Sequence, residues 1–307
     1  MRKRSASGLS FIEPMLPTLV DDAPEGDDWI REVKFDGYRS QLVKEFDKTR
    51  IFTRNGFDWS AKYAPLIKAA AGIDAVDAII DGEIIVFDLL GKPNFKALRS
   101  AITREPGKLV FIAFDLLHLS GHDLRGMAVE DRRALLADLI EESDTGGRFQ
   151  FSAAVEGTAE QVYRAIDGQG LEGMVSKRMG SPYESGRVTS WLKVKCYDEG
   201  DFKIVGVQRE RGKPAMALMA DGAGKYVGGA FVTLPQGIRK RLWDRVQAKA
   251  GATPPKGLAK EKAEWVKPGL VARVKFLKGE QKLRHATVKS FREGKLRGGS
   301  ASGLREE

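Results

Sequence analysis

The chain of 307 residues contains a single cysteine, Cys196, and only three histidines. One cysteine cannot form an internal disulfide, and its scarcity suits a reducing compartment. The histidines have no cysteine partners, which argues against a zinc site. No stretch approaches the roughly 18 consecutive apolar residues of a membrane-spanning helix. We therefore expect a globular protein of the cytoplasm, without a membrane partner.

The length and the charge distribution both indicate two domains. A chain of this size exceeds what one hydrophobic core usually serves. Residues 1–196 hold 27 Lys and Arg against 30 Asp and Glu, whereas residues 197–307 hold 24 against 12. This asymmetry suggests chemistry in the first part and polyanion binding in the second, although a generically basic domain is the alternative. We expect domains at 1–198 and 199–296, followed by a flexible tail at 297–307.

The hydrophobic pattern of the first part predicts an α+β domain. Helices are expected over 61–72 and 128–142, and a T-x-x-Q capping box at Thr158 opens a third that ends at Gly168. Short strands are expected between these helices, at 50–53, 78–87, 109–116, 173–176 and 190–194.

The second part reads as five short strands with one helix. The strands are expected at 202–208, 215–220, 225–231, 270–277 and 283–290, and the helix at 237–250. This content fits a small closed barrel of the oligonucleotide-binding type (OB-fold), with an open sheet as the alternative.

The most informative segment is E-V-K-F-D-G-Y-R, from Glu32 to Arg39. The run before it alternates as a half-buried strand, so Lys34 lies near a strand end and Asp36-Gly37 turns the chain. Nearby cations and partial burial both disfavour an ammonium group, and a neutral lysine is a nucleophile. Taken alone, K-x-D-G also fits a solvated lysine beside a turn.

Five further segments carry charged or aromatic groups at strand ends: T-R-N-G from Thr53, D-G-E from Asp81, F-D from Phe114, E-G-M-V-S-K from Glu172 and W-L-K-V-K from Trp191. Strand alternation puts the two lysines of the last segment on one face. Carboxylates can hold Mg²⁺, cations neutralise phosphates and an aromatic ring stacks on a base. Together with Lys34, the following residues amount to a nucleoside triphosphate site: Arg54, Glu83, Phe114, Glu172, Lys177, Lys193 and Lys195.

This ordered set of motifs resembles the covalent nucleotidyltransferases, which comprise ATP-dependent DNA ligases, RNA ligases and mRNA capping enzymes. The resemblance covers about residues 9–295 and is greatest to the ligase domain of bacterial non-homologous end-joining DNA ligases. It implies an adenylation domain of antiparallel sheets with flanking helices, followed by an OB-fold. The family usually has proline after the arginine-histidine pair at Arg284, where this chain has Ala286.

The resemblance also implies a function and a set of roles. The chain is expected to be an ATP-dependent DNA ligase that seals nicks or joined ends in DNA repair and recombination, through AMP linked to Lys34 and with Mg²⁺ or Mn²⁺ as metal. Glu32 would contact the adenosine, Arg39 the ribose or the nick end, and Phe114 the adenine. Arg54, Lys177, Lys193 and Lys195 would bind phosphates. Glu83 and Glu172 would contact the metal or the nucleotide. Arg284 and Arg292 would orient the pyrophosphate.

Several alternatives remain open from the sequence. Phe114 could be an ordinary core residue, Lys193 and Lys195 a solvated strand face, and Arg284 and Arg292 contacts to DNA phosphates. Trp191 is expected to pack in a core. A capping guanylyltransferase, an RNA ligase and a non-catalytic binding module are the competing functions. The expected partners are nicked or broken duplex DNA and either the end-binding protein Ku or a repair polymerase. We expect a monomer that is associated with the nucleoid. It should grip DNA through its barrel and through a loop at 91–107.

Overall fold

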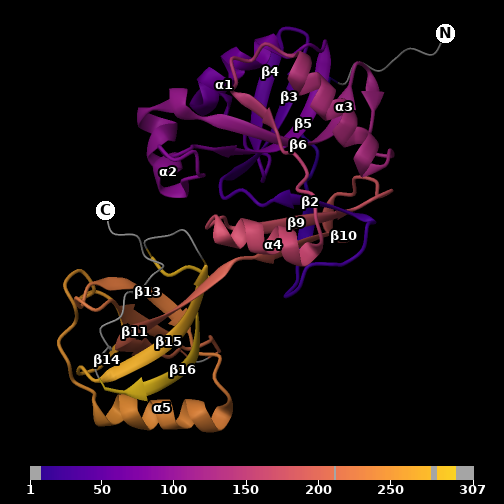
Figure 1. The fold of residues 1–307 in the computed structure, drawn as a ribbon. Helices are drawn as coiled ribbons and strands as arrows, with labels where there is room; N and C mark the ends of the chain where they lie inside the picture. Colours follow the sequence, from indigo (N-terminus) through magenta and orange to yellow (C-terminus); the bar gives the residue numbers. More distant parts are fainter. Residues whose placement is uncertain (1–7, 211, 278–281, 295–307) are drawn as a thin grey trace. The chain divides into compact units, whose positions relative to one another are not determined.

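A computed structural model describes residues 8–210, 212–277 and 282–294 (Figure 1). The chain divides into two compact units, Met1–Lys195 and Cys196–Glu307. The tail expected at 297–307 lies outside the described residues.

The first unit contains two sheets. The smaller sheet has the strand order β1 (Met15–Leu19), β10 (Gly186–Lys195), β9 (Gly173–Arg178) and β2 (Trp29–Val33). In it β1 is parallel to β10, and the other pairs are antiparallel. The larger sheet runs antiparallel through β4 (Lys48–Thr53), β3 (Tyr38–Glu45), β5 (Asp77–Ile85), β6 (Val110–Leu119) and β7 (His122–Asp123), with β8 (Phe149–Phe151) parallel to β6.

One helix of the first unit begins at the cap that the sequence predicts. Thr158 caps α4 (Ala159–Gly168) through the expected reciprocal box with Gln161, and α3 spans Val129–Glu142. The helix predicted over 61–72 is instead a 3₁₀ turn (Ser60–Tyr63), α1 (Ala64–Ala69) and a second 3₁₀ turn (Ala70–Gly72). Pro65 lies in the first turn of α1, where a backbone N–H would have no helical partner in any case. Inside a longer helix it would remove a backbone hydrogen bond, so the predicted single helix is divided there.

The segment 91–107 was expected to be a loop, and this expectation is wrong. Residues 95–104 form helix α2 (Phe95–Arg104), followed by a 3₁₀ turn (Pro106–Lys108). The Asn94 side chain accepts a hydrogen bond from the Ala97 N–H at the start of α2, which satisfies one otherwise unpaired donor. Leu98 and Ala101 then bury the inner face of the helix.

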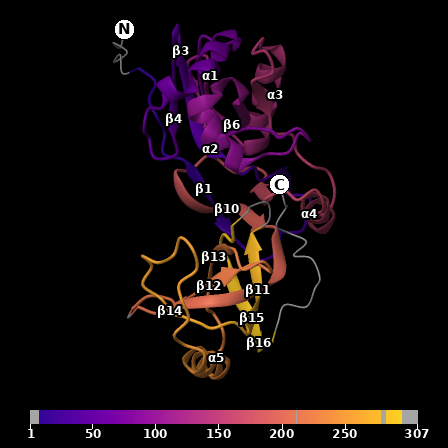
Figure 2. The same ribbon diagram turned by 90° about the vertical axis from the view of Figure 1, so that its left-hand side faces the viewer.

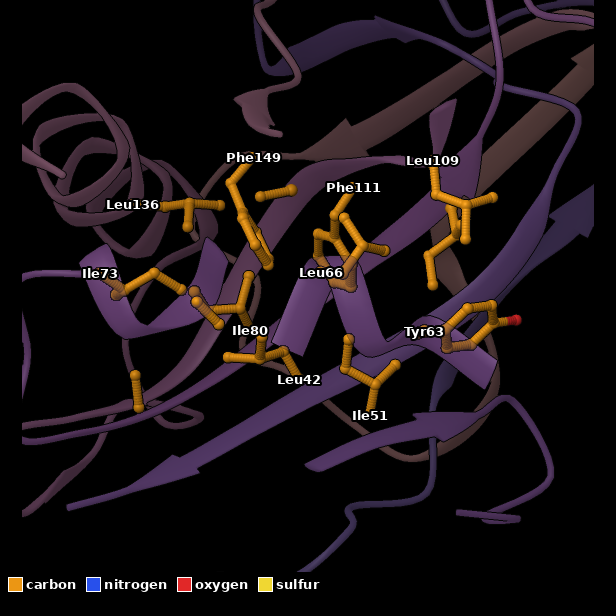
Figure 3. Close-up of a cluster of buried hydrophobic side chains, with 14 of the residues drawn as sticks. Leu42, Ile51, Tyr63, Leu66, Ile73, Ile80, Leu109, Phe111, Leu136 and Phe149 are labelled. Carbon is orange, nitrogen blue, oxygen red and sulfur yellow. The ribbon is translucent and has the colours of Figure 1, made fainter. Parts of the chain in front are cut away.

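The main core of the first unit lies between the larger sheet and its helices (Figure 3). The close-up shows side chains from β3, β4, β5 and β6 meeting Leu66 of α1 and Leu136 of α3. Burial of one such leucine stabilises the fold by about 1.5–3 kcal/mol. This core fixes the larger sheet, whose strands carry several of the site residues.

The second unit is a closed barrel, as predicted. Its strands are β11 (Tyr197–Gln208), β12 (Met216–Ala220), β13 (Tyr226–Phe231), β15 (Leu270–Leu277) and β16 (Thr287–Glu293), with β14 (Glu264–Trp265) added beside β11. The ladder runs from β11 through β12, β13, β16 and β15 and returns to β11, so the open-sheet alternative is wrong. Helix α5 (Gln236–Ala248) lies across one end of the barrel (Figures 1 and 2).

One strand of the barrel starts later than predicted. The sequence suggested a strand from Leu283, whereas β16 begins at Thr287. His285 has a positive φ of 47°, which breaks an extended run. Leu283 nevertheless donates its N–H to the carbonyl oxygen of Val227 at 2.7 Å, so the segment before β16 is still attached to β13.

Candidate nucleotide-binding and catalytic site

A pocket of about 620 Å³ lies in the first unit, lined by residues from both sheets. Its walls include the end of β2, the turn after β4, β5, the middle of β6, and β9 and β10. The fold therefore gathers segments that range from Leu16 to Lys193 in sequence around one cavity. Eight of the twelve predicted site residues line it: Glu32, Lys34, Arg39, Arg54, Glu83, Phe114, Lys177 and Lys193.

Lys34 follows β2 directly and faces a carboxylate as well as cations. Its backbone N–H donates to the carbonyl oxygen of Gly173 at 2.8 Å, which continues the β2–β9 ladder by one residue. Its Nζ contacts the Glu172 carboxylate, and the other oxygen of Glu172 lies 3.6 Å from Lys195 Nζ. Glu172 and Lys195 thus belong to the same site although they do not line the pocket wall.

The glycine after Glu172 is required by close packing. A Cβ at Gly173 would lie 2.1 Å from the carbonyl oxygen of Val194 on the neighbouring strand. Only glycine lets β9 and β10 approach there, and this approach places Glu172 against Lys34 and Lys195.

Glu32 and Lys177 form a buried ion pair at the inner end of the site. Glu32 Oε1 lies 2.7 Å from Lys177 Nζ and 2.8 Å from Arg133 Nη1, and Oε2 accepts a hydrogen bond from Ser152 Oγ at 2.8 Å. Burial lowers the pKa of Lys177, and the Glu32 charge opposes that shift. Arg133 was not predicted, because nothing in its helical sequence distinguishes it from a surface arginine.

Phe114 is half-buried and packed between cations and a second ring. The Arg39 guanidinium carbon lies 5.2 Å and Lys177 Nζ 4.9 Å from its ring centroid. Lys177 Nζ also donates to the Phe114 carbonyl oxygen at 2.7 Å. Trp191 is buried as expected and packs edge-on against Phe114, with centroids 6.3 Å apart.

Arg39 is held by a fully buried carboxylate. Its Nε and Nη2 donate to the two oxygens of Asp81 at 3.1 and 2.7 Å, and the Tyr183 hydroxyl donates to Asp81 Oδ2 at 2.5 Å. Burial alone disfavours the charged guanidinium, but the paired Asp81 raises the pKa of Arg39 above its usual range. Asp81 was missed as a site residue, although it opens the D-G-E segment. Nothing in the sequence around Tyr183 indicated that it would contact a site residue.

Glu83 and Lys193 both have perturbed pKa values. Burial raises the pKa of Glu83 to about 8, with Lys34 and Arg39 opposing the shift and Glu172 adding to it. Partial burial lowers the pKa of Lys193 to about 8, and the neighbouring cations, Lys34 first, lower it further. A bound anionic ligand would offset the repulsion between the neighbouring cations, and a bound divalent cation would favour the charged form of the carboxylates. Such perturbed groups in a cleft indicate a functional site.

The carboxylates fit a magnesium ion. Mg²⁺ keeps several waters and is usually bound through one or two carboxylates together with substrate phosphates. Glu83 and Glu172 offer that number of ligands, and no group of three or more candidate metal ligands occurs in the described ranges.

Arg284 and Arg292 belong to the second unit, whereas the residues that line the pocket all belong to the first. Arg292 Nη2 lies 3.1 Å from Asp201 Oδ2 within the barrel. The Arg284 carbonyl oxygen accepts a hydrogen bond from Leu277 at 3.0 Å.

Comparison with protein families decides the class. A model described as the ATP dependent DNA ligase domain matches residues 14–195, and one described as the ATP dependent DNA ligase C terminal region matches residues 207–295. The chain belongs to the ATP-dependent DNA ligase family. The predicted enzyme class, an ATP-dependent DNA ligase, and the two-part fold are confirmed.

Similar proteins place this ligase near end-joining enzymes. It is 32% identical over 302 residues to the multifunctional non-homologous end joining protein LigD of Pseudomonas aeruginosa, and the match covers 93% of the chain but 36% of that protein. The chain thus spans about a third of that relative. The crystal structure of the ligase domain of Mycobacterium tuberculosis LigD matches with a TM-score of 0.57 and 27% identity, covering 91% of this chain and 94% of that one. A mycobacterial DNA ligase D complexed with ATP and MES matches with a TM-score of 0.58 and 26% identity, covering 96% and 98%.

None of the helices in the described part of the ligase is long and apolar enough to cross a membrane.

Proposed function

We propose that this ligase seals nicks with 5′-phosphate and 3′-hydroxyl ends in duplex DNA through a lysyl-AMP intermediate at Lys34. The observation that carries the proposal is the position of the Lys34 amine. It lies at a strand end in the wall of a pocket that also holds a half-buried aromatic ring, the buried carboxyl of Glu83 with its raised pKa, and a set of cations. A nucleotide with a polyphosphate chain matches that combination of groups.

In the first step, Lys34 Nζ attacks the α-phosphorus of ATP. A phosphorus–nitrogen bond forms, the bond to pyrophosphate breaks, and the amine loses a proton. Glu172, which contacts this amine, holds it for attack. Such transfers depend on in-line positioning and charge neutralisation. We assign adenine stacking to Phe114 and the adenosine end to Glu32. We also place Lys177 at that end, instead of the phosphate role expected from the resemblance, because its Nζ contacts both Phe114 and Glu32.

The phosphate end of the nucleotide would meet the remaining cations. We assign phosphate contacts to Arg54, Lys193 and Lys195, and the ribose or the nick terminus to Arg39. Glu83 and Glu172 would hold Mg²⁺ or Mn²⁺, which neutralises phosphate charge when bound. Arg284 and Arg292 of the barrel are proposed to orient the pyrophosphate.

The second and third steps return the enzyme to its starting state. The 5′-phosphate of the nick takes the AMP from Lys34, which frees the amine, and the neighbouring 3′-hydroxyl then displaces AMP and closes the strand. The excess of basic residues in 197–307 supports DNA binding by the barrel. We further propose a role in end joining in the bacterial nucleoid, with Ku or a repair polymerase as helper, since the similar P. aeruginosa protein is named for that process.

Labelling with α-³²P-ATP tests the proposal. Wild-type protein should form an acid-stable adduct, Lys34→Ala should form none, and Lys48→Ala, which alters an exposed lysine at the start of β4, should label normally. Labelling by GTP but not ATP would overturn the proposal in favour of a capping enzyme. Sealing of nicked RNA but not nicked DNA would point to an RNA ligase, and DNA binding without any adduct to a non-catalytic module.

A further inference from the structure

The Glu32 carboxylate is held by a closed ring of contacts with two buried residues. Arg133 Nη1 lies 2.8 Å from Glu32 Oε1, and Arg133 Nη2 donates to the Ser152 carbonyl oxygen at 2.7 Å. Ser152 Oγ in turn donates to Glu32 Oε2 at 2.8 Å, which closes the ring. Of these three residues only Glu32 lines the pocket. Arg133 and Ser152 therefore act on a bound nucleotide through the residues that they hold.

The ring joins three elements that are far apart in the sequence. Glu32 belongs to β2 and Arg133 to α3, and Ser152 directly follows β8. An isolated bridge between Glu32 and Ala154 fixes the segment after β8 beside β2. The Arg133 guanidinium also packs over the Phe151 ring, with its central carbon 4.7 Å from the ring centroid. Arg133 and Ser152 are 5% and 3% exposed, so solvent does not compete for these contacts.

Arg133 supplies what the other cation on Glu32 does not. Lys177 Nζ lies 2.7 Å from the same oxygen, Oε1, and also donates to the Phe114 carbonyl oxygen at 2.7 Å. An ammonium group is a compact point charge, so Lys177 attracts the carboxylate without fixing its plane. A guanidinium presents its donors in a rigid fork. The ring through Arg133 and Ser152 contacts both carboxylate oxygens, and it thereby fixes the plane of the carboxylate.

We propose that Arg133 and Ser152 are positioning residues, which fix the Glu32 carboxylate so that it accepts a hydrogen bond from the 6-amino group of adenine. This inference rests on the proposed function, in which Glu32 lies at the adenosine end of the nucleotide. An ionised carboxylate can only accept hydrogen bonds. Adenine carries an amino donor at position 6, where guanine carries an oxygen acceptor. A fixed carboxylate therefore favours adenine, whereas one that can rotate away loses this selectivity.

Adduct formation with two triphosphates measures this selectivity in the full chain. ATP carries the 6-amino group, and purine riboside triphosphate carries a hydrogen atom at the same position. The wild-type rate constant of adduct formation at low nucleotide concentration should be about 10- to 100-fold higher with ATP, as expected for a hydrogen bond to a charged group. Both nucleotides are compared on the same protein sample, so the ratio of the two rate constants does not depend on the fraction of protein that is folded.

The variants change the ring and leave the pocket wall intact. Arg133→Gln should lower the ratio about tenfold, and Ser152→Ala, which removes a single hydroxyl, about threefold. Arg133→Lys should give an intermediate ratio, because a lysine keeps the charge but not the fork. Arg132→Gln is the matched control. Arg132 is the neighbouring buried arginine of α3, it pairs with Asp115 and it does not line the pocket, so this variant should keep the wild-type ratio.

Three results would overturn the positioning role. The first is a wild-type protein that forms the adduct equally fast with both triphosphates. The second is an unchanged ratio in Arg133→Gln or in Ser152→Ala, with Arg133→Lys in place of Arg133→Gln if the latter does not fold. The third is a loss of selectivity in Arg132→Gln as large as that in Arg133→Gln. If the wild type forms no adduct with ATP at all, the proposed function fails, which is a different result.

Discussion

The fully buried carboxylates Asp81 and Asp115 offer a matched test of how this ligase positions Arg39. Each carboxylate holds an arginine through two contacts: Asp81 holds Arg39 in the pocket, and Asp115 holds Arg132 with Nε and Nη2 at 2.8 and 2.9 Å. Both carboxylates are 0% exposed. The variants Asp81→Asn and Asp115→Asn keep the side-chain volume and remove the charge.

The two substitutions should destabilise the protein to a similar degree. Removing one partner of a buried ion pair leaves the other charge uncompensated, which costs about 3–5 kcal/mol. For a unit of this size the melting temperature should fall by roughly 6–20 °C, at about 2–4 °C for each kcal/mol. Scanning calorimetry of the metal-free protein measures this loss.

Activity should separate the two variants. Arg39 lines the pocket whereas Arg132 does not, so only Asp81→Asn frees a guanidinium beside the reacting groups. A displacement of about 1 Å in a positioning group can cost roughly 10²-fold in rate. Single-turnover sealing, measured at a temperature below the calorimetric transition of both variants, should therefore fall about 10²-fold for Asp81→Asn and stay near wild type for Asp115→Asn. Equal losses of sealing in the two variants, or no loss in either, would refute the reasoning.

Further predictions concern titration and packing. Because burial raises the pKa of Glu83 to about 8, the folded metal-free protein holds a proton that the unfolded chain loses near pH 4.5. The free energy of unfolding should thus decrease as the pH rises from 4.5 through 8. In the Glu83→Gln variant the melting temperature should depend less on pH over this range. Since the pKa of Lys193 is lowered to about 8, pyrophosphate affinity measured by calorimetry should weaken as the pH rises through 8, and an Arg54→Ala variant should move that change to higher pH. Gly173→Ala should lower the melting temperature by several degrees, because its Cβ meets the neighbouring strand, whereas Gly168→Ala has open space and should not.

Local patterns in the sequence placed the candidate site residues at strand ends, and the resemblance to the covalent nucleotidyltransferases supplied their expected roles. Lys34, Glu83 and Phe114 each lie at or within a strand that the alternation predicted, and the Thr158 capping box forms as expected. The OB-fold was predictable too, since short strands with one helix in about 100 residues match few other arrangements. The assignment of 91–107 to a loop failed because α2 buries only a few side chains, too few to show a clear helical period.

The sequence by itself therefore determined the two-part fold and the positions of the candidate site residues along the strands, because turns, caps and strand alternation depend on near neighbours. The proposed role of Lys34 as nucleophile came from the order of the motifs and their resemblance to the covalent nucleotidyltransferases. The tertiary structure alone decided which groups hold these residues in place. Asp81 reaches Arg39 across 42 residues and Tyr183 across 102, and Glu32 meets Ser152 across 120. These buried polar groups are paired because unpaired ones would be costly, and no local pattern indicates which distant residue the fold will bring to each of them.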